Sequence, residues 1–142
     1  MNIAMIRVVD LIKRQVVSLP ETATIREVAV ELAKNRVGLA VLTSVDNARK
    51  PVAVVSERDI LRAVAQRLDL EGPAKSIANP PITVLDTDTV KRAAEKMKTH
   101  NIRHVVVVNK DGDLVGVISI RDLCFEKAIL LELSSEEVPA TP

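Results

Sequence analysis

The sequence predicts an α/β (α+β) fold in which two β-α-β-β-α repeats pack sheet to sheet with pseudo-twofold symmetry. Three observations lead to this prediction. The chain of 142 residues aligns with itself at an offset of 65 residues, and each copy contains runs of Val, Ile and Leu that are typical of buried strands. A unit of roughly 60 residues also struggles to bury a sufficient core alone, so two copies must share one.

The internal repeat has two well-matched blocks. Residues 24–29 (Thr-Ile-Arg-Glu-Val-Ala) align with residues 89–94 (Thr-Val-Lys-Arg-Ala-Ala), and residues 54–60 align with residues 117–123 at an offset of 63. The change of offset lies between residues 43 and 51, a polar stretch that reads as a surface turn. Insertions are tolerated in such turns, so the change of register supports the repeat.

The first copy begins with a β-rich run over residues 16–19. A helix follows, with an apolar stripe of period 3.6 from Ile25 to Ala33, and the capping-box spacing of Thr24 and Glu27 fixes its start. Two buried strands and a second helix complete the copy, and we expect them over residues 39–42, 52–55 and 57–68.

The second copy repeats this order without the capping box. The predicted elements are a strand over residues 82–85, a helix with its stripe from Val90 to Met97, strands over 105–108 and 114–118, and a helix from Ile120 to about Leu131. A turn that contains Asp111-Gly112 joins the last two strands, which is a good hairpin signal.

These elements divide the chain into four parts. We expect the first repeat, with an N-terminal turn at Val8–Ile12, over residues 1–70, and a linker over residues 71–75. The second repeat is expected over residues 76–133, opening with a short helical turn, and a polar, flexible tail over residues 134–142.

Composition excludes several classes of function. The 20 basic and 19 acidic side chains give a formal charge of +1, and the one aromatic residue offers no stacking platform, so a nucleic-acid partner is not expected. No apolar stretch approaches the roughly 20 residues of a membrane span. The one cysteine cannot form an internal disulfide, and we therefore expect a cytoplasmic protein.

A Ser-x-Arg-Asp motif recurs in both copies, at residues 56–59 and 119–122, where a buried strand becomes a helix. Two interpretations are open. In the first, the serines are N-caps and the aspartates close capping boxes, with no further role.

The second interpretation is a ligand site. Arg58 and Arg121 would lie in a first helical turn, where the helix dipole disfavours a cation, and their presence in both copies suggests an anionic ligand. Helix N-terminal amides, a hydroxyl and a guanidinium suit a phosphate, whereas a carboxylate suits a pair of sugar hydroxyls. Together these groups describe a nucleotide.

The repeat that ends in this motif resembles a tandem pair of cystathionine-β-synthase (CBS) domains, over essentially Arg7 to Leu133. The resemblance implies a module with two clefts between its repeats, which bind adenosine-containing ligands such as AMP, ADP, ATP or S-adenosylmethionine. It also implies that two modules pair into a disc-like homodimer.

The resemblance assigns roles to particular residues. Asp59 and Asp122 would accept hydrogen bonds from ribose hydroxyls. The other implied ligand-binding residues are Ser56 and Ser119 at ribose or phosphate, Arg58 and Arg121 at the phosphates, and Val17 and Ile82 at the adenine. Arg103 and His104 are expected beside Asp59, and only Gly38 and Leu39 beside Asp122.

One departure from the family pattern makes the two clefts unequal. The glycine often found three residues before the serine is present as Gly116, but Ala53 replaces it in the first copy, where an extra methyl could crowd a ligand. We therefore expect unequal sites, with the more cationic Asp59 cleft preferring more phosphates.

The sequence thus predicts a non-enzymatic sensor or regulatory module for adenine nucleotides, acting on an unidentified partner protein. No catalytic residues, catalytic cofactor or metal site are expected, because the His100/His104 spacing spans a helix end and residues 109–113 lack the ligands of a calcium loop. Two alternatives stay open: a structural or assembly module with empty clefts, and binding of S-adenosylmethionine.

Overall fold

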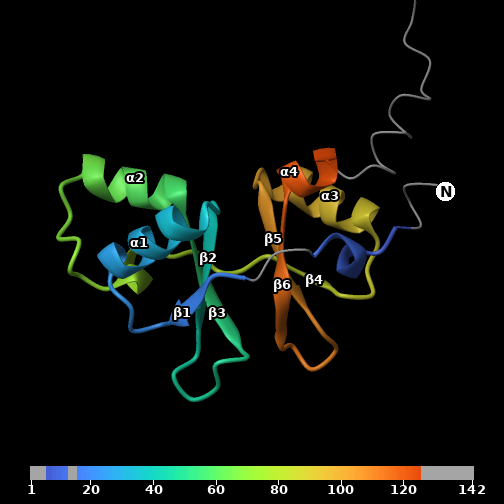
Figure 1. The fold of residues 1–142 in the computed structure, drawn as a ribbon, viewed down its shortest axis with the longest axis horizontal. Helices are drawn as coiled ribbons and strands as arrows, with labels where there is room; N and C mark the ends of the chain where they lie inside the picture. The colour runs from blue at the N-terminus through green and yellow to red at the C-terminus, as the bar shows by residue number, and fades with distance from the viewer. Residues whose placement is uncertain (1–5, 13–15, 126–142) are drawn as a thin grey trace, which may run out of the picture.

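The computed structural model describes residues 6–12 and 16–125 as two β-α-β-β-α units lying side by side (Figure 1). This confirms the predicted fold. The predicted tail, and the part of the last predicted helix after Phe125, lie outside the described residues. Within the described ranges, no helix is long and apolar enough to cross a membrane.

Each unit has one three-stranded sheet, in which the first two strands are parallel and the last two antiparallel. The first unit comprises β1 (Ser18–Pro20), α1 (Ile25–Asn35), β2 (Leu39–Thr43), β3 (Pro51–Ser56) and α2 (Glu57–Ala65). The second comprises β4 (Thr83–Leu85), α3 (Val90–His100), β5 (His104–Val108), β6 (Leu114–Ser119) and α4 (Ile120–Phe125). Two short 3-10 turns, η2 (Val8–Leu11) and η3 (Ala74–Ile77), lie where the sequence predicted short turns.

Local sequence signals fix the helix ends. The Thr24 hydroxyl accepts a hydrogen bond from the Glu27 amide at 3.0 Å, and the Thr24 amide donates to the Glu27 carboxylate at 3.3 Å, which confirms the capping box. α1 ends at Asn35 and is capped by Arg36, which adopts the left-handed conformation with φ 55°. α2 ends earlier than predicted, at Ala65, because the chain reverses through Arg67 at φ 57°.

The two sheets pack against each other through a shared apolar cluster. Leu39 and Val41 of β2 lie against Val106 and Val108 of β5, and all four side chains are buried. This cluster is separate from the core that each unit forms beneath its own helices. The predicted sheet-to-sheet packing is therefore confirmed.

The two short turns are exchanged between the units. Val8 and Leu11 of η2 are buried in the core of the second unit, and the Val8 amide donates to the Asp88 carbonyl at 3.0 Å. Ala74 of η3 is buried in the core of the first unit, where its amide donates to the Ala23 carbonyl at 2.9 Å. The prediction grouped the N-terminal turn with the first repeat, but Figure 1 shows this turn, in blue, beside α3 and β4.

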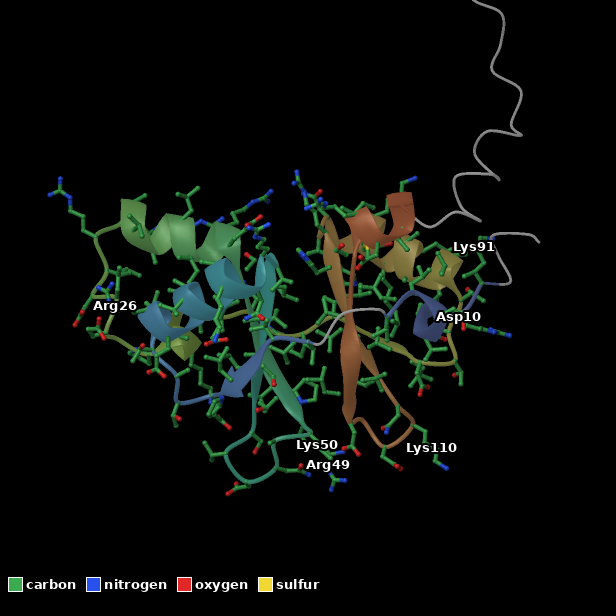
Figure 2. All side chains as sticks on the ribbon, viewed as in Figure 1. Asp10, Arg26, Arg49, Lys50, Lys91 and Lys110 are labelled. Atoms are coloured by element: carbon green, nitrogen blue, oxygen red, sulfur yellow. The ribbon has the colours of Figure 1, made fainter. Side chains whose placement is uncertain are left out.

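The hairpin ends of the two units also meet. Arg49 and Lys50 lie at the end of the β2–β3 hairpin, close to the hairpin of the second unit (Figure 2). Lys50 Nζ lies 2.8 Å from Asp113 Oδ1, and the Leu114 amide donates to the Arg49 carbonyl at 2.7 Å. The units are thus joined at the hairpin ends as well as through their sheets.

Candidate ligand-binding site

A cavity of about 720 Å³ is lined by both units. The first unit contributes apolar side chains from α1 and from the segments that begin β1 and β2, including Val17, Leu32 and Leu39. The second unit contributes the end of β6 and the start of α4, where Ser119 and Asp122 lie. An apolar wall with a few convergent polar groups is the usual form of a small-molecule site.

The second copy of the motif is both a helix cap and part of this cavity. The Ser119 amide donates to Asp122 Oδ2 at 2.8 Å, and the Ser119 hydroxyl accepts from the Asp122 amide at 3.2 Å. Among the described residues, the Ser119 amide is the one donor bonded to the Asp122 carboxylate. The half-buried Asp122 can therefore cap α4 through Oδ2 and still accept hydrogen bonds at Oδ1.

Cationic side chains gather around this cavity. Arg36, Arg103 and Arg121 line it, together with the carboxylates of Glu57 and Asp122. Guanidinium groups bind phosphate through paired, charge-assisted hydrogen bonds. The cavity thus combines donors for a phosphate, a carboxylate that can accept from a ligand hydroxyl, and an apolar wall.

His104 forms part of the wall beside the start of β2. Burial lowers the pKa of His104, and the nearby Glu57 and Asp122 carboxylates oppose this shift only in part. A Cβ atom on Gly38 would lie 3.2 Å from His104 Cε1, so the glycine leaves room for the imidazole. The neutral imidazole can donate at one nitrogen and accept at the other.

The first copy of the motif has different surroundings. Asp59 is only 8% exposed and does not line the cavity of Asp122. Its Oδ2 accepts from the Ser56 amide at 2.8 Å and from the Ser56 hydroxyl at 2.9 Å. Asn79 Nδ2 lies 3.3 Å from each carboxylate oxygen, and Arg62 Nη1 lies 3.8 Å from Oδ1.

Three arginines therefore line the cavity of Asp122, whereas the sequence-based expectation placed the more cationic cleft at Asp59. Arg103 and His104 were expected beside Asp59, but they line the cavity of Asp122 together with Gly38 and Leu39. The reason is the packing of the two units: β2 and β5 share an apolar cluster, so both strands begin at the same cavity.

The remaining predicted residues are distributed between the two units. Val17 lines the cavity of Asp122, whereas Ile82 packs against the core of the second unit. Both lie in equivalent backbone positions, since their carbonyls accept from the Val41 and Val106 amides at 2.9 Å. Arg58 is exposed at the start of α2, and Ser56 is engaged with Asp59.

Ala53 and Gly116 both face cores and not a cleft, which corrects the expected crowding of a ligand. Ala53 is buried in the core of the first unit. A Cβ atom on Gly116 would lie 2.9 Å from Ile12 Cγ2, so packing of Ile12 against β6 requires the glycine.

Sequence reasoning missed Arg36 and Glu57. Arg36 reaches the cavity because it ends α1 in a left-handed conformation two residues before Gly38. The sequence did contain a signal for this cap position, because the apolar stripe of the first helix ends shortly before the strand predicted over residues 39–42. No sequence signal assigned Glu57 to the cavity of the other copy.

The fold and the cavity define a class of protein, namely a tandem-repeat module with a ligand cavity between its repeats. The model of the CBS domain family matches residues 8–66 and 74–128. The chain belongs to the CBS domain family, whose domain pairs are generally regulatory modules.

Three similar proteins illustrate this membership. The structure of a CBS domain protein from Pyrobaculum aerophilum complexed with AMP is 79% identical, covers 92% of this chain and 100% of that chain, and superposes with a TM-score of 0.87. An uncharacterized 17.7 kDa protein from Acidianus ambivalens is 32% identical over 101 residues, which are 70% of this chain. An uncharacterized protein from Methanopyrus kandleri is 25% identical over 132 residues, which are 91% of this chain. The chain spans 60% and 66% of the lengths of the last two relatives.

Proposed function

We propose that this chain is a non-enzymatic regulatory module that binds an adenine nucleotide, AMP or its di- and triphosphate relatives, in the cavity of Asp122. The observation that carries the proposal is the combination, in one cavity, of the Asp122 carboxylate, which is bonded to the Ser119 amide through Oδ2, three arginines and an apolar wall. The AMP complex of the Pyrobaculum aerophilum protein supports the choice of ligand, since that protein shares 79% of its residues with this chain.

Each group has a distinct part in this proposal. Asp122 Oδ1 accepts hydrogen bonds from the ribose hydroxyls while Oδ2 stays bonded to the Ser119 amide. Arg121 and Arg103 bind phosphate, and Arg36 adds a third cation. The adenine lies against the apolar wall that includes Val17.

The proposal is tested by calorimetric titration with AMP, ADP and ATP. Loss of a hydrogen-bonding carboxylate costs about 1.5–3 kcal/mol, so Asp122→Ala is expected to weaken AMP binding by roughly tenfold to a hundredfold. Asp46→Ala, which removes an exposed carboxylate from the β2–β3 hairpin, is the matched control and keeps full affinity. Absence of nucleotide binding, or equal affinities for the native protein and Asp122→Ala, contradicts the proposal.

A second measurement uses the composition of the chain. Because the sequence contains no Trp or Tyr and one Phe, absorbance near 260 nm reports bound nucleotide with little protein background. A nucleotide band released when the purified protein is denatured identifies the ligand after chromatography.

A structural module with empty clefts is the second candidate function. It is favoured by the capping boxes, since both motif aspartates have a helix-capping role without a ligand. The same titration separates the two candidates. S-adenosylmethionine is titrated in parallel, and tighter binding of this compound than of any nucleotide changes the ligand class.

We also propose that the module forms a homodimer. The outer face of α2 exposes Leu61 and Val64, which are 69% and 54% exposed, and Ile120 is exposed on α4. Light scattering with size-exclusion chromatography is expected to show a dimer that Leu61→Glu converts to a monomer. A native protein that is monomeric at all concentrations refutes this arrangement.

The location and the partner of the module are separate proposals. A cytoplasmic location is proposed because the one cysteine of the chain cannot form an internal disulfide. We propose that the nucleotide-bound state of the module acts on a regulated protein, which is not identified.

A further inference from the structure

We propose that Asn79 closes the first copy of the motif, so that each chain binds one nucleotide, at Asp122, and not two. This inference rests on the proposed function. It adds the number of nucleotides that each chain binds, and it gives a role to Asn79, which lies outside the repeated motif.

The two aspartates differ in their free hydrogen-bonding capacity. Asp122 accepts from one described donor, the Ser119 amide, and lines a cavity. Asp59 accepts from the Ser56 amide, the Ser56 hydroxyl and the Asn79 side chain, and Arg62 lies 3.8 Å from Oδ1. Both Asp59 oxygens are therefore engaged before any ligand arrives.

Asn79 is held in place by its backbone. Its amide donates to the Val54 carbonyl at 2.9 Å, and its carbonyl accepts from the Val54 amide at 2.8 Å. This antiparallel bridge attaches Asn79 to β3. The side-chain amide is thereby fixed 3.3 Å from each oxygen of Asp59.

A nucleotide at Asp59 has to displace this amide. The ribose hydroxyls compete with this amide for the same carboxylate oxygens, so each new hydrogen bond to the ribose replaces one that already exists and adds less binding energy. Asn79 is an exposed residue, and its amide lies on a carboxylate that is itself only 8% exposed.

The charges around the two aspartates favour the same outcome. The three arginines of the cavity lie with Asp122. Near Asp59, Arg62 already faces Oδ1, and Arg58 is exposed at the start of α2. A phosphate therefore gains more at the Asp122 cavity.

The test is the stoichiometry of AMP binding, measured by calorimetry. The native chain is expected to bind one AMP, and Asn79→Ala two, because the backbone bridge to Val54 survives while the amide is removed. The double variant Asn79→Ala with Asp59→Ala is expected to return to one. The matched control is Asn35→Ala, which removes an exposed amide bonded to Glu31 on α1 and leaves the number at one.

The outcomes separate this inference from the proposed function. Two AMP molecules on the native chain, or one on a folded Asn79→Ala variant, overturns the role of Asn79 while nucleotide binding stands. Absence of AMP binding in every variant overturns the proposed function itself. Circular dichroism melting of each variant verifies that it is folded.

Discussion

Asp59 and Asp122 show how one residue type in one motif acquires two sets of partners. Each carboxylate accepts from the backbone amide of its own serine at 2.8 Å, as a capping box requires. The difference comes from Asn79, which lies 20 residues after Asp59 in the sequence and reaches it only in the folded chain. The caps could be predicted from the Ser-x-Arg-Asp spacing, but the covering amide could not, because its placement depends on the bridge to β3.

At the residue scale, His104 gives the chain a pH dependence of stability. Burial lowers the pKa of His104 in the folded protein, whereas the unfolded chain titrates near the usual value of about 6.5. As the pH falls through this region, the unfolded state binds a proton that the folded state takes up less readily, so the free energy of unfolding decreases. Glu57, Asp122 and Arg103 are the charged groups that influence this titration.

We predict that His104→Gln reduces the loss of stability between about pH 7.5 and about pH 5.5. Urea denaturation followed by circular dichroism measures the free energy of unfolding at each pH. His100→Gln, which changes the exposed histidine at the end of α3, is expected to behave like the native protein. The same pH dependence in the native protein and in His104→Gln would falsify the prediction.

At the scale of elements, β6 depends on close packing of the N-terminal segment. Ile12 follows η2 and lies against Gly116, where a Cβ atom would approach Ile12 Cγ2 to 2.9 Å. The equivalent position in the first unit is Ala53, so the need for glycine is particular to β6.

We predict that Gly116→Ala lowers the free energy of unfolding by about 1–3 kcal/mol, the usual cost of overpacking a core. Ile12→Ala alone is also expected to lower the free energy of unfolding. The double variant is expected to lose less than the sum of the two single losses, because the clash disappears. Chemical denaturation of the four proteins gives this coupling. Additive effects would show that the contact between Ile12 and Gly116 is not the cause.

The elements themselves were largely predictable, for local reasons. Apolar periodicity and the Thr24–Glu27 box are properties of neighbouring residues, and the structure has the helix and its cap where they indicated. The position of η2 was not predictable in this way. Its apolar Val8 and Leu11 could pack into the core of either unit, and only the packing of the complete chain places them in the core of the second unit.

At the scale of the whole molecule, the two units depend on each other. They share the buried cluster of β2 and β5, exchange their short turns, and meet at Lys50 and Asp113. The 65-residue repeat predicted two packed copies, but not which cleft holds the cations. That outcome depends on Arg36, Arg103 and Arg121 converging from different elements on one cavity.

We predict that the two repeats unfold together. Val106→Ala removes part of a side chain that is 1% exposed at the sheet-to-sheet interface, and it is expected to cost about 1–3 kcal/mol while the protein keeps one calorimetric transition. The control is Val45→Ala, at an exposed position of the β2–β3 hairpin, which is expected to change the free energy of unfolding by less than about 0.5 kcal/mol. Two separate transitions in the native protein would show that each unit folds alone.

The most direct test of the central claim is a crystal structure of this chain grown with AMP. The proposed function predicts AMP in the cavity shared by the two units, with its ribose hydroxyls within hydrogen-bonding distance of Asp122 and its phosphate beside the arginines. Asn79 is expected to remain on Asp59. AMP bound to Asp59 with the cavity of Asp122 empty, or AMP bound outside both motifs, would contradict this assignment.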